Sequence, residues 1–315
     1  MRMHALWIVS FAVSMHATPL HATTPVALPV ANDIIGRWDM TVQGPSGDGP
    51  AWLEVTLSGR ATLVGSFMAF VGSARPVSKV EYADGTWRFA IPPQWEAGTD
   101  DARVEMRLDN DKLVGWLTTP EGARLPFVGV RAPELRHAEP KWGAPVALFD
   151  GKSLSGWQST GATNQWQVIH GILTSPTPGS NLRTARVFTD FKLHVEFRLP
   201  PKGNSGVYLR GRDEAQVEDS KGMGLDSHHM GGIYGFLTPS EDAAKGPGEW
   251  QSMDITLVGR LVTVVLNGHP IIVRQEIPGI TGGALDSNEG EPGPIMLQGD
   301  HTSIEYRTVV LTPPR

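Results

Sequence analysis

Apolar and polar residues alternate along most of this chain with a period of two, which predicts β-strands. In the first half, short alternating runs are separated by turn sequences such as Ser58-Gly59 and Asn110-Asp111. The runs span residues 34–42, 51–57, 61–71, 86–91, 103–108, 112–117 and 124–130. Strands at this spacing predict a small antiparallel β-barrel or sandwich over residues 33–130, which we interpret as an accessory domain.

Residues 131–145 contain three prolines among mixed charges and are predicted to be a linker. A second β-domain is predicted over residues 146–315, where the alternating runs are longer. In the run 190–199, Phe191, Leu193, Val195 and Phe197 alternate with polar residues. This pattern predicts a sandwich of two sheets, with apolar faces packed together and polar faces turned toward a concave cleft.

The stretch 203–220 has two chemically distinct faces. A turn is expected at 203–206, after which Val207 and Leu209 alternate with Tyr208 and Arg210. After Gly211 the alternation resumes, and its polar positions are Glu214, Gln216 and Glu218. These polar residues predict the floor of a binding cleft, although an exposed strand with ordinary surface charges accounts for the same spacing.

Composition agrees with an all-β protein and excludes some partners. The 36 glycines and 25 prolines favour many turns over long helices. A net charge of -6 offers no basic surface for nucleic acid or anionic lipid. The chain has no cysteine, so no disulfide contributes to its stability.

The N-terminus resembles a secretory signal peptide. Residues 1–4 include Arg2, the run 5–13 is apolar, and small residues follow around Ala17 and Ala22. The apolar run is too short to span a bilayer, so we expect cleavage after Ala22, or after Ala17, and no membrane insertion of the mature chain. The expected location is periplasmic or secreted. The alternative is a buried apolar N-terminal strand.

Seven sequence blocks in residues 146–311 carry a family resemblance. They are LFDGKSLSGW at 148–157, DFKLHVEFRLP at 190–200, GNSGVYLRGRDEAQVEDS at 203–220, GGIYG at 231–235, GEWQSMDI at 248–255, LNGHPI at 266–271 and GPIMLQGDH at 293–301. This part of the chain resembles the 3-keto-disaccharide hydrolase domain family, long labelled as a domain of unknown function. The resemblance implies a concanavalin-like jelly-roll sandwich that acts on small-molecule carbohydrates, the 3-keto-glycosides.

The implied substrate defines the chemistry that the site needs. A ketone at C3 of a sugar acidifies the C2 hydrogen, so a base can remove it, the C1 substituent can leave by elimination, and water can then add, or net hydrolysis can result. The candidate carboxylates are Glu214 and Glu196, and the candidate proton carrier is His301, oriented by Asp300. Arg210 and Arg198 are candidates for stabilising the enolate.

Further side chains are candidates for substrate binding, and the metal requirement stays open. The complete set of candidate binding residues is Arg198, Asn204, Tyr208, Arg210, Gln216, Tyr234, Trp250 and Gln298. No cofactor is assigned with certainty. A divalent metal ion is left open as the enolate stabiliser, with ligands drawn from His194, His228, His229, His301 and Asp300.

Two other functions are compatible with the sequence. One is a retaining glycosidase of the jelly-roll type, in which Glu214 and Glu218 are nucleophile and acid; that reaction needs carboxyl groups about 5–5.5 Å apart. The other is a lectin-like carbohydrate-binding module without catalysis, because the same fold serves both purposes. Several ionisable groups in one cleft favour an enzyme.

Strand parity gives a geometric prediction for the site. Each candidate below alternates with apolar neighbours that must face the core, so we expect all of them on one concave face of one sheet, with His301 at its rim. The set is Glu196, Arg198, Tyr208, Arg210, Glu214, Gln216, Gln298 and Asp300.

Overall fold

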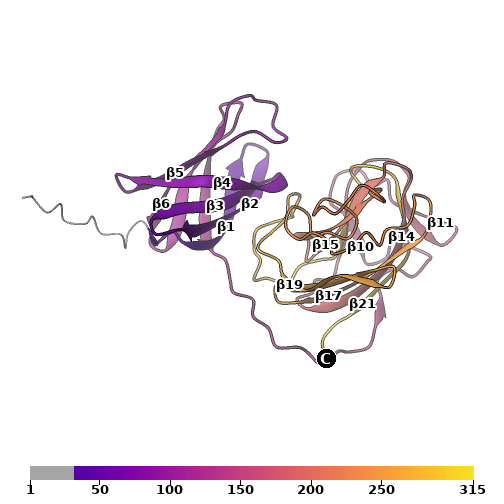
Figure 1. Cartoon of the computed structure of the whole chain (residues 1–315). Coiled ribbons are helices and arrows are strands. Elements are labelled where there is room, and N and C mark those ends of the chain that lie inside the picture. Colours follow the sequence, from indigo (N-terminus) through magenta and orange to yellow (C-terminus); the bar gives the residue numbers. More distant parts are fainter. Residues whose placement is uncertain (1–31) are drawn as a thin grey trace, which may run out of the picture. The chain divides into compact units, whose positions relative to one another are not determined.

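All named elements in the described part of the chain are β-strands, β1 to β21 (Figure 1). The computed structural model describes residues 32–315, and residues 34–315 form one compact unit. The expected signal peptide, residues 1–22, lies outside the described residues. No helix in the described part is long and apolar enough to cross a membrane.

The first eight strands close into an antiparallel barrel, because β8 pairs with β1. Inward-facing residues such as Trp38, Met40 and Val42 are fully buried and fill its interior. The predicted small β-barrel is therefore confirmed. Its strands are β1 (Gly36–Gly44), β2 (Gly47–Ser58), β3 (Thr62–Ala69), β4 (Val71–Ala83), β5 (Thr86–Ile91), β6 (Ala102–Asp109), β7 (Lys112–Thr118) and β8 (Arg124–Arg131).

Strand β4 was not predicted from the sequence. Its buried positions begin with Ser73 and Arg75, which are polar, so the apolar alternation starts only at Val77. Arg75 forms an ion pair with Glu96 at 3.0 Å, which compensates for the burial of its charge. A buried polar pair of this kind removes the period-two signal that identifies a strand.

The remaining strands form a sandwich of two antiparallel sheets. The five-stranded sheet has the order β10-β13-β20-β15-β16, and the eight-stranded sheet has the order β11-β12-β21-β14-β17-β18-β19 with β9 paired to β21. The strands are β9 (Val146–Ala147), β10 (Trp157–Ser159), β11 (Gln167–Ile169), β12 (Ile172–Ser175), β13 (Leu182–Thr184), β14 (Phe191–Arg198), β15 (Asn204–Leu209), β16 (Asp213–Glu218), β17 (Gln251–Val258), β18 (Leu261–Leu266), β19 (His269–Glu276), β20 (Met296–Leu297) and β21 (Ile304–Thr312).

One apolar core lies between the two sheets. Leu193 and Val195 of β14 belong to the same buried cluster as Val207 of β15 and Val217 of β16. Because side chains alternate across a strand, the polar residues between these positions lie on the outer faces. The five-stranded and eight-stranded sheets therefore each present their own polar face, and the predicted sandwich of jelly-roll type is confirmed.

Candidate active site

The β15–β16 hairpin positions the central side chains of the site. Its turn residues, Arg210 and Gly211, have φ angles of 53° and 68°, and the Arg212 amide donates to the Leu209 carbonyl at 3.0 Å. Two consecutive positive φ angles are typical of a type I′ turn. Leu209 pairs with Asp213, so the three residues 210–212 connect the two strands and set their register. In that register Tyr208 lies opposite Glu214, so the two side chains share the outer face of the five-stranded sheet.

A pocket with a cavity volume of about 110 Å³ lies over this face. Eight of the predicted site residues line it: Asn204, Tyr208, Glu214, Gln216, Tyr234, Gln298, Asp300 and His301. Five further residues complete the lining: Val71, Gly72, Asn181, Gly282 and Gly283. The structure thus brings together most of the residues selected from the sequence, and their individual roles stay predictions.

Glu214 is the buried acid of this pocket, with 3 % of its surface exposed. The space for its carboxyl group comes from Gly206, where an added Cβ would lie 2.0 Å from Oε1 of Glu214. A turn was expected at 203–206, but residues from Asn204 onward belong to β15. Burial, reinforced by the charge of Asp300, raises the pKa of Glu214 to about 8.

The Tyr208 hydroxyl contacts both the Glu214 carboxyl and the Gly282 carbonyl. The Tyr208 hydroxyl lies 2.9 Å from Oε2 of Glu214 and 2.9 Å from the carbonyl oxygen of Gly282. Burial raises the pKa of Tyr208 well above its ordinary value, so this group remains a hydroxyl. It can donate its single proton to either acceptor.

Asp300 and His301 follow β20 at the mouth of the pocket. Nδ1 of His301 lies 2.5 Å from Oδ1 of Asp300, and both side chains are partly exposed. The hydrogen bond to Asp300 raises the pKa of His301. An imidazole held in this way can accept and donate a proton, and its partial exposure places it at the rim where it was expected.

Amide side chains provide further hydrogen-bonding atoms in the pocket. Gln216 donates from Nε2 to Oδ1 of Asn204 at 3.3 Å. The Oε1 atoms of Gln216 and Gln298 are buried, and neither has a hydrogen-bond partner among the described residues. Buried acceptors without partners are costly, which favours a ligand that carries several hydroxyl donors.

Three candidate site residues lie away from this pocket, and the predicted place of Glu196 and Arg198 on the same face as Glu214 is wrong. Glu196 and Arg198 are on β14 of the eight-stranded sheet, and Trp250 precedes β17 of the same sheet. Parity correctly gives a polar face to β14, but it does not say which sheet the strand joins. Glu196 instead pairs with Arg307 at 2.8 Å.

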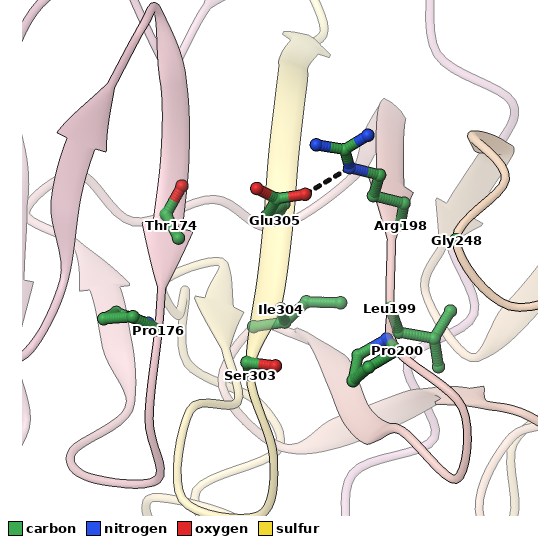
Figure 2. Close-up of a pocket in the computed structure, with 9 residues that line it drawn as sticks. All are labelled: Thr174, Pro176, Arg198, Leu199, Pro200, Gly248, Ser303, Ile304 and Glu305. Atoms are coloured by element: carbon green, nitrogen blue, oxygen red, sulfur yellow. Dashed lines mark hydrogen bonds and ion pairs between the residues drawn. The ribbon is translucent and has the colours of Figure 1, made fainter.

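Arg198 lines a different hollow, on the eight-stranded sheet (Figure 2). There it faces Glu305 of β21, and the two side chains form an ion pair. The guanidinium of Arg198 also lies 4.9 Å from the ring of Trp250. These charges are partly exposed and satisfy one another, so this hollow lacks the buried, perturbed acid of the Glu214 pocket.

Arg210 and Glu218 also do not line the Glu214 pocket. The hairpin turn at Arg210 interrupts the alternation, and its side chain is buried beside Asp213, with NH2 and Oδ2 3.3 Å apart. The predicted placement of Arg210 in the cleft is therefore wrong. Without Glu218 in the lining, the pocket does not contain the carboxylate pair of the retaining glycosidase alternative.

The candidate metal ligands are dispersed. Within residues 32–315 no group of three or more His, Asp or Glu side chains is arranged to hold a metal ion. His194 is hydrogen-bonded to Asp254 on the eight-stranded sheet, and His228 is hydrogen-bonded to Asp226.

Sequence reasoning missed the remaining lining residues. Gly282-Gly283 carried a signal, because paired glycines often mark a close backbone approach, and an added Cβ on Gly283 would lie 2.5 Å from the Tyr208 hydroxyl oxygen. Asn181 carried no such signal in the sequence. In the structure its Oδ1 accepts a hydrogen bond from the Gly299 amide at 2.8 Å, which orients the side-chain amide. Val71 and Gly72 come from the barrel and were not expected at the site.

Comparison with known proteins gives one family and several solved structures. A search of curated proteins found no match. A Parabacteroides distasonis protein provisionally named a glycosyl hydrolase is 28% identical, with 57% of this chain and 93% of that chain covered and a TM-score of 0.47. A second such protein from Parabacteroides distasonis is 24% identical over 54% of this chain and 98% of that chain, with a TM-score of 0.43.

A carbohydrate-binding module from Bacillus subtilis is 13% identical, with 49% of this chain and 93% of that chain covered and a TM-score of 0.34. The family model of the 3-keto-alpha-glucoside-1,2-lyase-like domain matches residues 144–312, more than half of the 315-residue chain. This range contains both sheets of the sandwich and all lining residues of the pocket except Val71 and Gly72. The chain therefore belongs to the family of 3-keto-alpha-glucoside-1,2-lyase-like domains.

Proposed function

We propose that this protein is an exported enzyme that cleaves the glycosidic bond of 3-keto-glycosides in the Glu214 pocket. The observation that carries the proposal is a buried carboxyl group with a pKa raised to about 8, in one pocket with a histidine–aspartate pair. A carboxylate that must remove a proton from carbon benefits from high basicity, and burial supplies it. The family to which the chain belongs supports a 3-keto sugar as substrate.

The first step is removal of the C2 proton by the Glu214 carboxylate. The electron pair of the C2–H bond moves toward C3, and the ketone becomes an enolate. Side-chain amides of Asn181, Asn204 and Gln298 line the pocket, and their N–H groups are suited to donate to the enolate oxygen. They take the role that the sequence had suggested for Arg198 and Arg210.

The second step is departure of the C1 substituent. The enolate electron pair forms the C1–C2 double bond while the C1–O bond breaks, and the leaving oxygen takes a proton from protonated His301. Asp300 stabilises the protonated imidazole, as the raised pKa of His301 indicates. The products at this stage are the free alcohol and an unsaturated 3-keto sugar, which completes a lyase reaction.

Water can then convert the unsaturated product into the free 3-keto sugar. The oxygen of water adds to C1 and its proton passes to His301, while protonated Glu214 returns a proton to C2. Both residues recover their starting states, and the net change is hydrolysis of one glycosidic bond. Elimination and hydration thus use the same two proton carriers in opposite directions.

The test is release of sugar from the 3-keto derivatives of maltose and cellobiose, which present the two anomeric linkages. The wild-type protein is expected to release glucose from at least one, while Glu214→Gln loses at least about 100-fold in rate. Glu196→Gln is the matched control, since its carboxyl lies on the other sheet, and it should keep the wild-type rate. No release from either substrate, or equal loss in both variants, contradicts the proposal.

A further inference from the structure

The barrel reaches the Glu214 pocket through one corner, residues 70–73, which we call the barrel corner. Phe70 joins β3 to β4 with a φ of 63°, and the next two residues, Val71 and Gly72, line the pocket. All other lining residues belong to the sandwich. The barrel and the sandwich lie in one compact unit, so this contact lies within a single body.

Backbone contacts fasten the barrel corner to the Gly282-Gly283 loop. The Gly283 amide donates to the Phe70 carbonyl at 2.8 Å. An added Cβ on Gly282 would lie 2.2 Å from the Gly72 carbonyl oxygen, so only a glycine permits this approach. The same loop supplies the Gly282 carbonyl to Tyr208, so one loop connects the corner to the residue beside Glu214.

Side chains provide a second attachment. Ser73 is hydrogen-bonded to Nε2 of His228, whose Nδ1 lies 2.5 Å from Oδ1 of Asp226. The ring of Tyr234, which lines the pocket, packs edge-on against His228, with centroids 4.8 Å apart. The position of Ser73 is therefore coupled to that of a pocket side chain.

An apolar cluster beneath the corner makes the attachment rigid. Trp52 and Met68 of the barrel are buried together with Ile280 and Ala284 of the sandwich loop. The ring of Phe236 packs edge-on against Trp52, with centroids 5.4 Å apart. Buried apolar contact of this kind resists local opening, so the corner is a fixed wall.

We propose that the barrel corner is the wall of the substrate pocket that selects among 3-keto-glycosides, with Val71 as its contact residue. Val71 is 44% exposed and lines a pocket that is otherwise mostly polar. An exposed apolar side chain at this place is suited to the C–H face of a sugar ring or to an apolar substituent. This inference rests on the proposed function, because it names a specificity residue for that reaction.

The absence of cysteine from the chain allows a direct test. Val71→Cys places a single thiol in the pocket wall, and Val130→Cys places one on β8 at a residue that is 47% exposed and does not line the pocket. Each is combined with Glu214→Gln, so that substrate stays bound and intact. The rate of maleimide labelling is then measured with and without the 3-keto and the unoxidised forms of maltose and cellobiose.

Sugar at ten times its dissociation constant should slow labelling of the Val71→Cys protein about tenfold and leave labelling of the Val130→Cys protein unchanged. In an independent assay, Val71→Trp should raise the KM for the cleaved disaccharide about tenfold or more, and Val130→Trp should not. Equal labelling of the Val71→Cys protein with and without a sugar whose binding is shown by calorimetry overturns the inference. A Val71→Trp enzyme with unchanged KM for every substrate also overturns it.

The outcomes separate this inference from the proposed function. Suppose that a 3-keto-disaccharide is cleaved but the thiol of the Val71→Cys protein is not protected. The proposed role of the barrel corner is then wrong, and the proposed function still stands. Protection of that thiol by unoxidised maltose or cellobiose without cleavage of any 3-keto form refutes the function and supports the wall as part of a sugar-binding site. If none of the four sugars protects the thiol and none is cleaved, both are wrong.

Discussion

The Tyr208 hydroxyl and the Glu214 carboxylate lie 2.9 Å apart, and the same hydroxyl lies 2.9 Å from the Gly282 carbonyl. When Glu214 is ionised, Tyr208 can donate to it. When Glu214 is protonated, it can donate to the tyrosine oxygen, while Tyr208 donates to Gly282. Both protonation states of the carboxyl are thus hydrogen-bonded without movement of heavy atoms, which suits a group that takes and returns a proton.

Tyr208→Phe should shift the pH dependence of activity to higher pH. The hydrogen bond from Tyr208 favours the ionised form of Glu214 and so lowers its pKa; loss of the bond raises that pKa further above 8. The ionised base then appears only at higher pH, and kcat/KM near pH 7 falls. Tyr306→Phe is the control, because Tyr306 is also fully buried but does not line the pocket. Identical pH profiles for wild type and Tyr208→Phe contradict this role.

Glu214→Gln should make the protein more stable while it abolishes activity. The pKa of Glu214 rises from 4.5 to about 8 on folding, so the native state loses stability as pH increases between those values. At pH 7 the variant should therefore have a free energy of unfolding roughly 3 kcal/mol higher than wild type, at 1.36 kcal/mol for each pKa unit. Urea unfolding at pH 4 and pH 7 measures this: the variant should gain mainly at pH 7.

Glu196→Gln should behave in the opposite way in the same urea experiment. Hydrogen bonds from Arg307 and Thr308 lower the pKa of Glu196 to about 2, so its ionised form stabilises the native state above the unfolded pKa of about 4.5. The variant should lose stability at pH 7 and keep its activity. A gain in stability for this variant, or a loss for Glu214→Gln, shows that the burial argument is wrong.

His301→Gln should slow cleavage of alcohol leaving groups far more than cleavage of a nitrophenyl leaving group. If His301 protonates the departing oxygen, its loss costs about 100-fold or more with a sugar leaving group. A nitrophenolate departs without a proton, so a nitrophenyl 3-keto-glucoside should retain most of the rate. His269→Gln, an exposed histidine outside the pocket, is the control. Equal losses with both leaving groups exclude the acid role.

Asp39→Asn should flatten the pH dependence of stability. Burial, together with the charge of Glu289, raises the pKa of Asp39 from 3.8 to about 9. Its contribution to stability is complete below the unfolded pKa and declines as pH rises toward 9. The variant should therefore unfold at higher urea than wild type at pH 8, with little difference at pH 4. Asp48→Asn, at an exposed position, should follow the wild-type curve.

The face of each strand could be predicted from the sequence, whereas the pairing of strands into sheets could not. Alternation placed Tyr208, Glu214 and Gln216 correctly on one face, because burial of their neighbours leaves no other orientation. The same alternation on β14 misplaced Glu196. Which sheet a strand joins depends on contacts that are distant in sequence, and alternation within the strand carries no information about them.

Two other differences have local physical causes. Arg210 occupies a turn position with positive φ, which is uncommon outside glycine, asparagine and aspartate. The sequence therefore showed no sign of the turn, and the alternation of β15 was extended one residue too far, to Arg210. The barrel corner was not foreseen because Val71 comes from a domain separated from Glu214 by more than a hundred residues. Its part in the pocket depends on tertiary packing alone.

The raised pKa of Glu214 depends on the lack of a side chain at Gly206. Glycine within a strand costs stability, about 0.5–1 kcal/mol relative to alanine in general. Here one methyl group would occupy the place of a carboxyl oxygen, because the added Cβ would lie 2.0 Å from Oε1 of Glu214. Selection for a buried, strongly basic Glu214 would therefore act on a residue with no side chain, and a substitution as mild as glycine to alanine would push the carboxyl out of the site that gives it its basicity.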